Sequence, residues 1–214
     1  MAANSAAVFS WAWVVRRFRI ASTRLAAVML VLLAAVTEHS WSEDGWVDFG
    51  LEITGMTLVL IALIGRSWCT LYIAGRKDRV LVTEGPYALS RNPLYFFSFL
   101  GALGVAAGTE TLTFICGVAA LFAFYYPFVI REEEKKLLAL HGAQFEEYRR
   151  TVPAFFPRWS AVRVFKEGQE LVVNPRLFRK HLFSVVWFVI AFLLVHSFEW
   201  LHEIKLLPVY FHLY

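Results

Sequence analysis

Residues 93–130 read PLYFFSFLGALGVAAGTETLTFICGVAALFAFYYPFVI, two apolar segments of helical length joined at Gly108-Thr-Glu-Thr. A proline suits the first turn of a helix, so Pro93 predicts the start of a helix of about fifteen residues. The second helix is expected to reach about Ile130. The two segments predict a tight membrane hairpin, because small residues let membrane helices approach closely. The residues expected to meet across it are Gly101, Ala102, Gly104 and Ala106 on one arm and Gly117, Ala119 and Ala120 on the other.

The composition of the whole chain is that of a membrane protein. Of its 214 residues, 58% are hydrophobic and only 18% are charged, which leaves too little polar surface for a soluble domain. Further apolar segments lie at about 25–36, 49–64 and 182–198, and the second continues as a helix to Tyr72. We expect an all-α polytopic membrane protein with about five transmembrane helices. Residues 1–214 form one domain in this prediction, because no polar linker divides them.

The positive charges predict the orientation in the membrane. If the N-terminus, residues 65–92 and residues 131–181 share one side, 20 of the 21 Lys and Arg residues lie there. Cytoplasmic loops of membrane proteins carry such an excess. We therefore expect these segments in the cytoplasm and the C-terminal tail on the opposite side. The aromatic tail after residue 200 and a short helix at 9–20 are expected to lie in the interface.

The segment before the hairpin, Gly85 to Tyr95, reads GPYALSRNPLY and is the first candidate site. Its two prolines predict an ordered, non-helical connector, because each removes a backbone donor and restricts the preceding residue. Arg91 and Asn92 directly precede the helix that starts at Pro93. The free N–H groups and positive end of that helix favour an anion at the same place.

The segment after the hairpin supplies acidic residues. On a helix, Glu133 and Glu134 share a face with Leu137 and Leu138, whereas Glu132 points away and can pair with Lys136. One interpretation is a solvated helix start with ion pairs. The alternative places these carboxylates beside Arg91, because the hairpin returns the chain to the same end. A carboxylate and an arginine in one crevice complement a zwitterionic amino-acid group.

Two motifs carry a family resemblance. GPYALSRNPLY is followed by EExxLxxxHGxxFxxYxxxVPxxxP at residues 133–157, and together they resemble the signature of the isoprenylcysteine carboxyl methyltransferase and phospholipid methyltransferase superfamily. The resemblance covers residues 76–157. It implies S-adenosylmethionine bound in a cytoplasmic pocket at the end of the hairpin and a lipophilic acceptor entering from the membrane lipids.

The resemblance also implies roles for individual residues. Arg91 would bind the methionyl carboxylate in a bidentate manner, with Asn92 on the same group. Glu133 or Glu134 would face the ammonium or a ribose hydroxyl, and tyrosines would line the adenine or sulfonium. The catalytic set is Arg91, Glu133 and Glu134. The cofactor-binding set is Tyr87, Arg91, Asn92, Pro93, Tyr95, Glu133, Glu134, His141 and Tyr148.

Two departures from the family pattern bear on the reaction. The family usually has His at the position of Asn92, and Phe and Tyr at the positions of His141 and Phe145. Asn92 cannot act as a base, because an amide does not exchange a proton near neutral pH. This favours O-methylation of an isoprenylcysteine-type carboxylate. The alternatives are a phospholipid amine N-methyltransferase, with Glu133 or Glu134 as base, and a non-catalytic membrane scaffold or sensor.

Neither a metal site nor a nucleic-acid partner is expected. Cys69 and Cys116 lie in different segments without a CxxC or Cys/His cluster, and we expect both to be buried, reduced thiols. The histidines lack the repeated spacing of membrane di-iron oxygenases. His196 and Glu199, near the outer end of the last span, are expected to be an interfacial pair.

Overall fold

The computed structural model describes residues 28–213 except 41–44, 78, 165–172 and 174. The predicted helix at 9–20 and the start of the first predicted span lie outside the described residues. Residues 28–34 are helical. The further helices are α2 (Trp46–Ile73), α3 (Pro86–Leu89), α4 (Pro93–Ala107), α5 (Leu112–His141), α6 (Ala143–Thr151), the 3-10 helix η1 (Trp159–Val164) and α7 (Pro175–Glu203).

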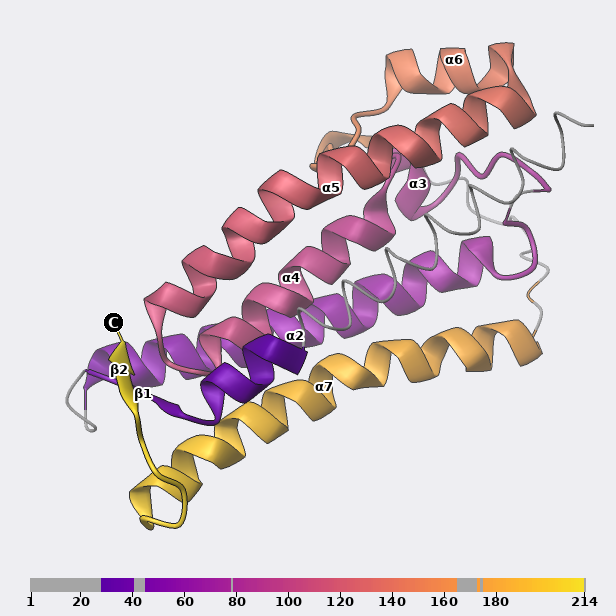
Figure 1. The fold of residues 1–214 in the computed structure, drawn as a ribbon. Helices are drawn as coiled ribbons and strands as arrows, with labels where there is room; N and C mark the ends of the chain where they lie inside the picture. Colours follow the sequence, from indigo (N-terminus) through magenta and orange to yellow (C-terminus); the bar gives the residue numbers. More distant parts are fainter. Residues whose placement is uncertain (1–27, 41–44, 78, 165–172, 174, 214) are drawn as a thin grey trace, which may run out of the picture.

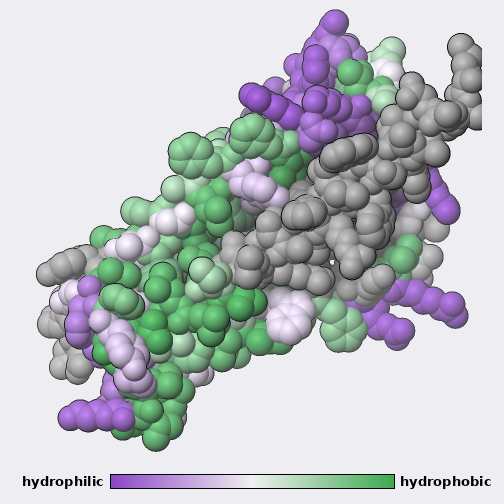
Figure 2. All heavy atoms as spheres, in the orientation of Figure 1, coloured by the Kyte–Doolittle hydropathy of each residue, from purple (hydrophilic) through white to green (hydrophobic). Residues whose placement is uncertain are grey.

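The long helices confirm the all-α membrane architecture. In the described part of the chain, α2, α5 and residues 185–203 of α7 are long and apolar enough to cross a membrane. Figure 2 shows a hydrophobic surface between hydrophilic ends. Helix α4 has 15 residues and measures about 22 Å, less than the apolar thickness of about 30 Å. The total of five spans therefore stays a prediction.

Helix α4 lies at the centre of the bundle, between α2 and α5, and α7 packs against both α2 and α4 (Figure 1). Helix α6 packs on α5 beyond the bundle, and α3 lies nearby at the same end. We call this the motif end, formed by residues 66–77, 79–95 and 133–158. The opposite end holds β1 (Thr37–His39) and β2 (Phe211–Leu213), and we call it the strand end.

The two strands form a small parallel sheet that the sequence analysis did not predict. Thr37 pairs with Phe211 and His39 with Leu213, so the C-terminal tail adds to the segment after helix 28–34. The imidazole Nε2 of His202 lies 3.0 Å from the carbonyl oxygen of Ala35. Backbone pairing therefore attaches the tail to the segment after helix 28–34.

The close helix packing lies between α4 and α2, so the predicted contact of small residues across the hairpin is wrong. A Cβ atom added at Gly104 would lie 2.7 Å from the carbonyl oxygen of Gly55 in α2, whereas one at Gly117 in α5 would meet nothing within 4 Å. The two hairpin arms meet instead through aromatic rings, such as Phe99 and Phe122 with centroids 5.1 Å apart. Rings of this size keep α5 farther from α4 than glycine contacts would.

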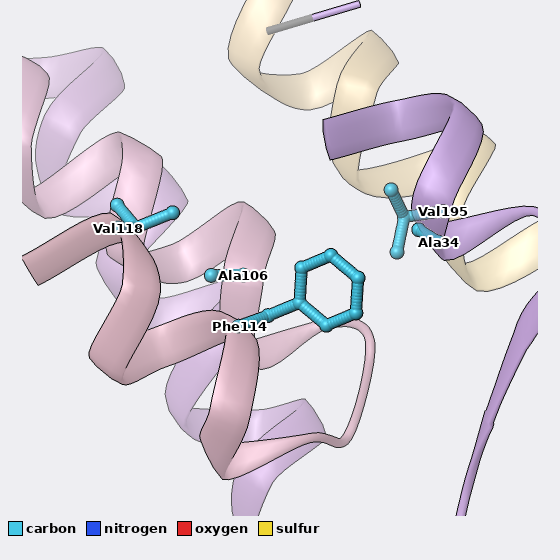
Figure 3. Packing of buried hydrophobic residues seen from close by; sticks show 5 residues of the cluster. All are labelled: Ala34, Ala106, Phe114, Val118 and Val195. Carbon is cyan, nitrogen blue, oxygen red and sulfur yellow. The ribbon is translucent and has the colours of Figure 1, made fainter. Parts of the chain in front are cut away.

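A hydrophobic cluster joins four segments near the strand end. Figure 3 shows the Phe114 ring of α5 extending toward Val195 of α7 and Ala34 of helix 28–34, with Ala106 of α4 beside it. This cluster anchors the first described helix to the bundle. Both cysteines are free thiols, but only Cys69 is buried; Cys116 is exposed, contrary to the prediction.

Candidate functional site: a cavity at the motif end

The motif end contains a cavity of about 620 Å³. This is within the range of small-molecule sites, about 300–1,000 Å³. It is bounded by the last turns of α2, residues 79–82, the 85–95 segment, α5 and α6. The predicted residues among its described lining are Tyr87, Arg91, Asn92, Tyr95, Glu133 and Tyr148.

The 85–95 segment reaches the cavity through a sharp turn. Gly85 has φ of +60°, and a Cβ atom there would lie 2.4 Å from the Tyr72 ring, so the position requires glycine. Residues Pro86–Leu89 form one helical turn, α3, which corrects the prediction of a wholly non-helical connector. Pro86 is at the first helical position, where its fixed φ favours the turn. Asn92 precedes α4, which begins at Pro93 as predicted.

The two sequence motifs form one structural unit. The Ser90 hydroxyl donates to the carbonyl of Phe155 at 2.9 Å, and the Asn92 side-chain amide donates to the carbonyl of Ala154 at 2.9 Å. The backbone N–H of Arg91 donates to the carbonyl of Pro153, also at 2.9 Å. We call these contacts the latch between the 85–95 segment and residues 152–158. The latch explains why both motifs occur together, because each completes the hydrogen bonds of the other.

Arg91 is held by the protein on two of its three nitrogens. Its Nε lies 2.8 Å from Oε1 of Glu134 in an ion pair whose side chains are 11% and 16% exposed. Its Nη1 donates to the carbonyls of Arg149 at 2.7 Å and Val152 at 2.5 Å. No described residue accepts a hydrogen bond from Nη2. A ligand carboxylate can therefore bind Nη2, while the bidentate contact expected from the sequence would have to displace Glu134 or the carbonyls.

The two predicted carboxylates are placed differently. Glu133 lines the cavity, with Oε1 3.7 Å from Nζ of Lys77. Glu134 is absent from the described lining and instead orients Arg91. Glu132 faces outward as expected, but its exposed ion pair, at 2.6 Å, is with Lys135 and not with the predicted Lys136. A direct contact with a bound ligand thus remains a prediction for Glu133, and Glu134 becomes a positioning residue.

Two tyrosines carry buried hydroxyl groups beside the cavity. Tyr148 donates its hydroxyl to the backbone carbonyl of Tyr87 at 2.6 Å. The hydroxyl of Tyr87 is buried and has no hydrogen-bond partner among the described residues. Burial raises the pKa of both phenols, so both are neutral donors at physiological pH. An unsatisfied buried hydroxyl is costly, and a polar ligand in the cavity would satisfy it.

Three further predicted residues are less informative about the ligand. Tyr95 lines the cavity and packs edge-on against Tyr126, with ring centroids 5.4 Å apart. Pro93 is fully buried as the first residue of α4, and His141 ends α5; neither is in the described lining. Their roles in cofactor binding stay predictions.

The sequence analysis missed the basic residues contributed by α2 and the following segment. Arg66, Lys77 and Arg79 line the cavity together with Arg91. Arg66 donates a hydrogen bond to the Ser98 hydroxyl and lies 5.4 Å from the centroid of the Phe188 ring. Its signal in the sequence was a single charge within an apolar helix, which is by default a functional-site candidate. Four cations and one carboxylate, Glu133, therefore line the described part of the cavity.

The comparisons with known proteins agree with the motifs. A family model described as phospholipid methyltransferase matches residues 49–144. Protein-S-isoprenylcysteine O-methyltransferase of Schizosaccharomyces pombe is 36% identical over 83 residues, which are 38% of this chain and 34% of that enzyme. A longer match, to the nickel-cobalt-cadmium resistance protein NccN of Alcaligenes xylosoxydans xylosoxydans, is 40% identical over 194 residues, 91% of this chain and 89% of that protein.

The chain belongs to the phospholipid and isoprenylcysteine methyltransferase superfamily. The chain is also similar to the cobalt-zinc-cadmium resistance protein CzcN of Cupriavidus metallidurans. The two are 41% identical over 187 residues, which are 87% of this chain and 84% of that protein. No solved structure matches the chain. The motif-end cavity lies largely within the part of the chain that the family model matches, residues 49–144.

Proposed function

We propose that the chain is an S-adenosylmethionine-dependent methyltransferase that esterifies the carboxylate of a lipophilic acceptor. The observation that carries the proposal is the excess of cations in the motif-end cavity, four against one carboxylate in its described lining. S-adenosylmethionine has one carboxylate, one ammonium and a sulfonium. An anionic acceptor bound beside the cofactor would be stabilised by the remaining cations of the cavity. An amine acceptor would instead add to the positive charge of the cavity.

The residues of the cavity fit this cofactor. Nη2 of Arg91 is a donor for the methionyl carboxylate, and Glu133 is an acceptor for the ammonium or a ribose hydroxyl. The buried hydroxyl of Tyr87 offers one more donor. Tyr95 presents an aromatic ring, which attracts a cationic group such as a sulfonium.

The reaction requires alignment rather than proton transfer. The cofactor supplies an electrophilic methyl group. A lone pair of an acceptor carboxylate oxygen forms the new O–C bond while the C–S bond breaks, and the bonding electrons stay on sulfur. The products are a neutral methyl ester and S-adenosylhomocysteine, so the protein has to orient the reactants and exclude water. Asn92 is compatible with this role, because its amide is a hydrogen-bond donor in the latch and no base is needed.

The acceptor enters from the membrane in this proposal. Apolar residues line the cavity beside the charged groups; they include Leu94, Leu137 and Leu177, which lies at the start of α7. A lipid chain could lie against these residues with its polar group near the cations. From the distribution of Lys and Arg we place the motif end in the cytoplasm and the C-terminal tail on the other side.

Purified protein in lipid nanodiscs tests the reaction. With methyl-labelled S-adenosylmethionine and a farnesylated cysteine peptide, we expect a base-labile labelled ester and one equivalent of S-adenosylhomocysteine. The matched acceptor is the same peptide with a C-terminal amide, which should give no product. Label on phosphatidylethanolamine instead would support N-methylation. Cofactor binding without turnover on any lipid extract would support the scaffold or sensor.

The similarity to two proteins named for metal resistance suggests a physiological setting. We propose that the methyltransferase contributes to tolerance of cobalt, nickel or cadmium. A strain that lacks the gene should grow more slowly in these metals. Recovery by the wild-type gene but not by Arg91→Ala would connect tolerance with methyl transfer, and equal recovery by both would separate them.

A further inference from the structure

A second cavity, of about 400 Å³, lies at the strand end. It is formed by the first turns of α2, the turn between α4 and α5, and the last turns of α7. Its described lining consists of Gly45, Asp48, Phe49, Glu52, Glu110, His196, Glu199, Trp200 and Glu203. None of these residues lines the motif-end cavity, which lies toward the other end of the 28-residue helix α2.

Three side chains in this cavity lie close enough to one another to share a metal ion. Glu110, His196 and Glu199 each offer one ligand atom, and the three atoms lie within 4.8 Å of one another. Bonds of about 2.0–2.2 Å from a central ion place ligand atoms about 3.3–3.8 Å apart in tetrahedral or trigonal geometry, so the three side chains would move closer together on binding a metal. Nδ1 of His196 is 3.3 Å from Oε2 of Glu199, and its Nε2 is 4.0 Å from Oε1 of Glu52.

Asp48 supplies an independent observation. It is only 6% exposed, and neither of its carboxylate oxygens has a hydrogen-bond partner in the described part of the protein. A buried carboxylate without a partner is strongly unfavourable. Since Asp48 lines the same cavity, a cation there would compensate its charge.

The charge of the strand-end cavity also favours a bound cation. Five of its lining residues are acidic, and the described lining contains neither lysine nor arginine. Carboxylates at such distances repel one another unless a cation or protons lie between them. The turn before α5 places Glu110 in this group with φ of +54° and only 5% exposure. The fold thus buries an acidic residue beside other acidic residues.

We propose that the strand-end cavity binds one divalent transition-metal ion through Glu110, His196 and Glu199, with Asp48 and Glu52 as nearby carboxylates. The imidazole selects the metal class, because nitrogen with oxygen ligands suits Zn²⁺, Co²⁺ and Ni²⁺, whereas Mg²⁺ and Ca²⁺ prefer oxygen ligands alone. The site goes beyond the proposed methyl transfer, and none of its ligands lies in the cofactor cavity. His196 and Glu199 form the pair expected from the sequence, and the proposal adds a metal ion to this pair.

Cobalt titration of the purified full chain, freed of any polyhistidine tag, tests the site. We expect visible d–d absorption that saturates at one Co²⁺ per chain, and metal analysis after dialysis should give the same stoichiometry. His196→Ala and Glu110→Gln should each weaken binding at least tenfold. The control is His212→Ala, because His212 also pairs with a carboxylate at the strand end, Glu38 at 3.7 Å, but belongs to no such group among the described residues.

Two control measurements distinguish the loss of the metal site from misfolding and from unspecific binding of cations. Thermal unfolding without metal shows whether each variant folds, and His196, with a side chain that is 45% exposed, is expected to tolerate replacement. Excess Ca²⁺ should not displace Co²⁺. The proposal is overturned if the wild type binds no stoichiometric Co²⁺, if folded His196→Ala binds as tightly as the wild type, or if Ca²⁺ competes equally. Equal loss in His212→Ala would also overturn it.

Discussion

The two ends of the bundle differ in charge although the same helices form both. At the motif end, Arg66 and the residues after α2 border a cavity whose described lining has four cations and one carboxylate. At the strand end, Asp48 and Glu52 of the same helix border a cavity whose described lining has five carboxylates and one histidine. A bundle of apolar helices can thus carry two polar sites of opposite sign, provided that they lie at opposite ends. Each site should then respond to its own substitutions, and only the packing between the helices should affect both.

Arg91→Ala should have the largest effect, and only at the motif end. The variant loses the contact of Nε with Glu134, the two contacts of Nη1 and the donor proposed for the cofactor. Hydrogen bonds to charged groups contribute about 1.5–3 kcal/mol each, so methyl transfer and S-adenosylmethionine affinity should fall by about 100-fold or more. Calorimetry measures the affinity. Cobalt binding at the strand end is the internal control and should not change.

Arg91→Lys separates charge from geometry. Lysine keeps the positive charge but cannot reach Glu134 and the two carbonyls with a planar group. We expect it to remain close to Arg91→Ala in cofactor affinity. Affinity near the wild-type value in Arg91→Lys would mean that charge alone matters and that the observed contacts of Arg91 do not position it.

Gly104→Ala should affect both ends, with an intermediate effect. The new methyl group would lie 2.7 Å from the carbonyl oxygen of Gly55 and force α4 away from α2. Overpacking of this kind costs about 1–3 kcal/mol, which thermal unfolding in detergent measures. Gly117→Ala is the matched control, because nothing lies within 4 Å of its Cβ. It should be neutral or stabilise the helix by about 0.5–1 kcal/mol. If Gly117→Ala were the more destabilising of the two variants, the close helix packing would lie between α4 and α5, within the hairpin.

Tyr87→Phe should have the smallest effect and should sharpen the assignment of the cofactor. If its buried hydroxyl binds the cofactor, the affinity should fall about threefold to tenfold, or roughly 1 kcal/mol, without loss of stability. Tyr148→Phe is the paired variant. It loses the hydrogen bond to the Tyr87 carbonyl and should lower stability by about 1 kcal/mol. Unchanged affinity in Tyr87→Phe would remove this hydroxyl from the proposed site.

The bounds of the helices could be predicted from the sequence better than the contacts between them. The start of α4 at Pro93 and the outward position of Glu132 followed from a proline and from the helical period, which are local signals. The contact of Gly104 with Gly55 did not follow, because small residues show that a close approach is possible without naming the opposing helix. The strand pair β1–β2 joins segments more than 170 residues apart, and its two three-residue strands are too short for a periodic pattern.

Only part of the candidate site could be predicted from the sequence, because the motifs locate residues along the chain but do not identify their partners in space. The motifs located Tyr87, Arg91 and Glu133, which the fold brings to one cavity. They could not show that Arg91 is held by backbone carbonyls, because such contacts depend on where residues 149–152 lie in space. Arg66 is a single charge in a segment whose apolar length predicts a span, and the sequence alone does not show which residues surround it.

Covalent labelling tests most directly where the cofactor binds. Ultraviolet cross-linking of the purified protein with methyl-labelled S-adenosylmethionine, followed by peptide mapping, reports the aromatic residues beside it. We predict label on peptides that contain Tyr87, Tyr95 or Tyr148, and its loss with excess S-adenosylhomocysteine. Label confined to peptides from the strand end, such as residues 196–210, or no label that S-adenosylhomocysteine prevents, would contradict a cofactor site at the motif end.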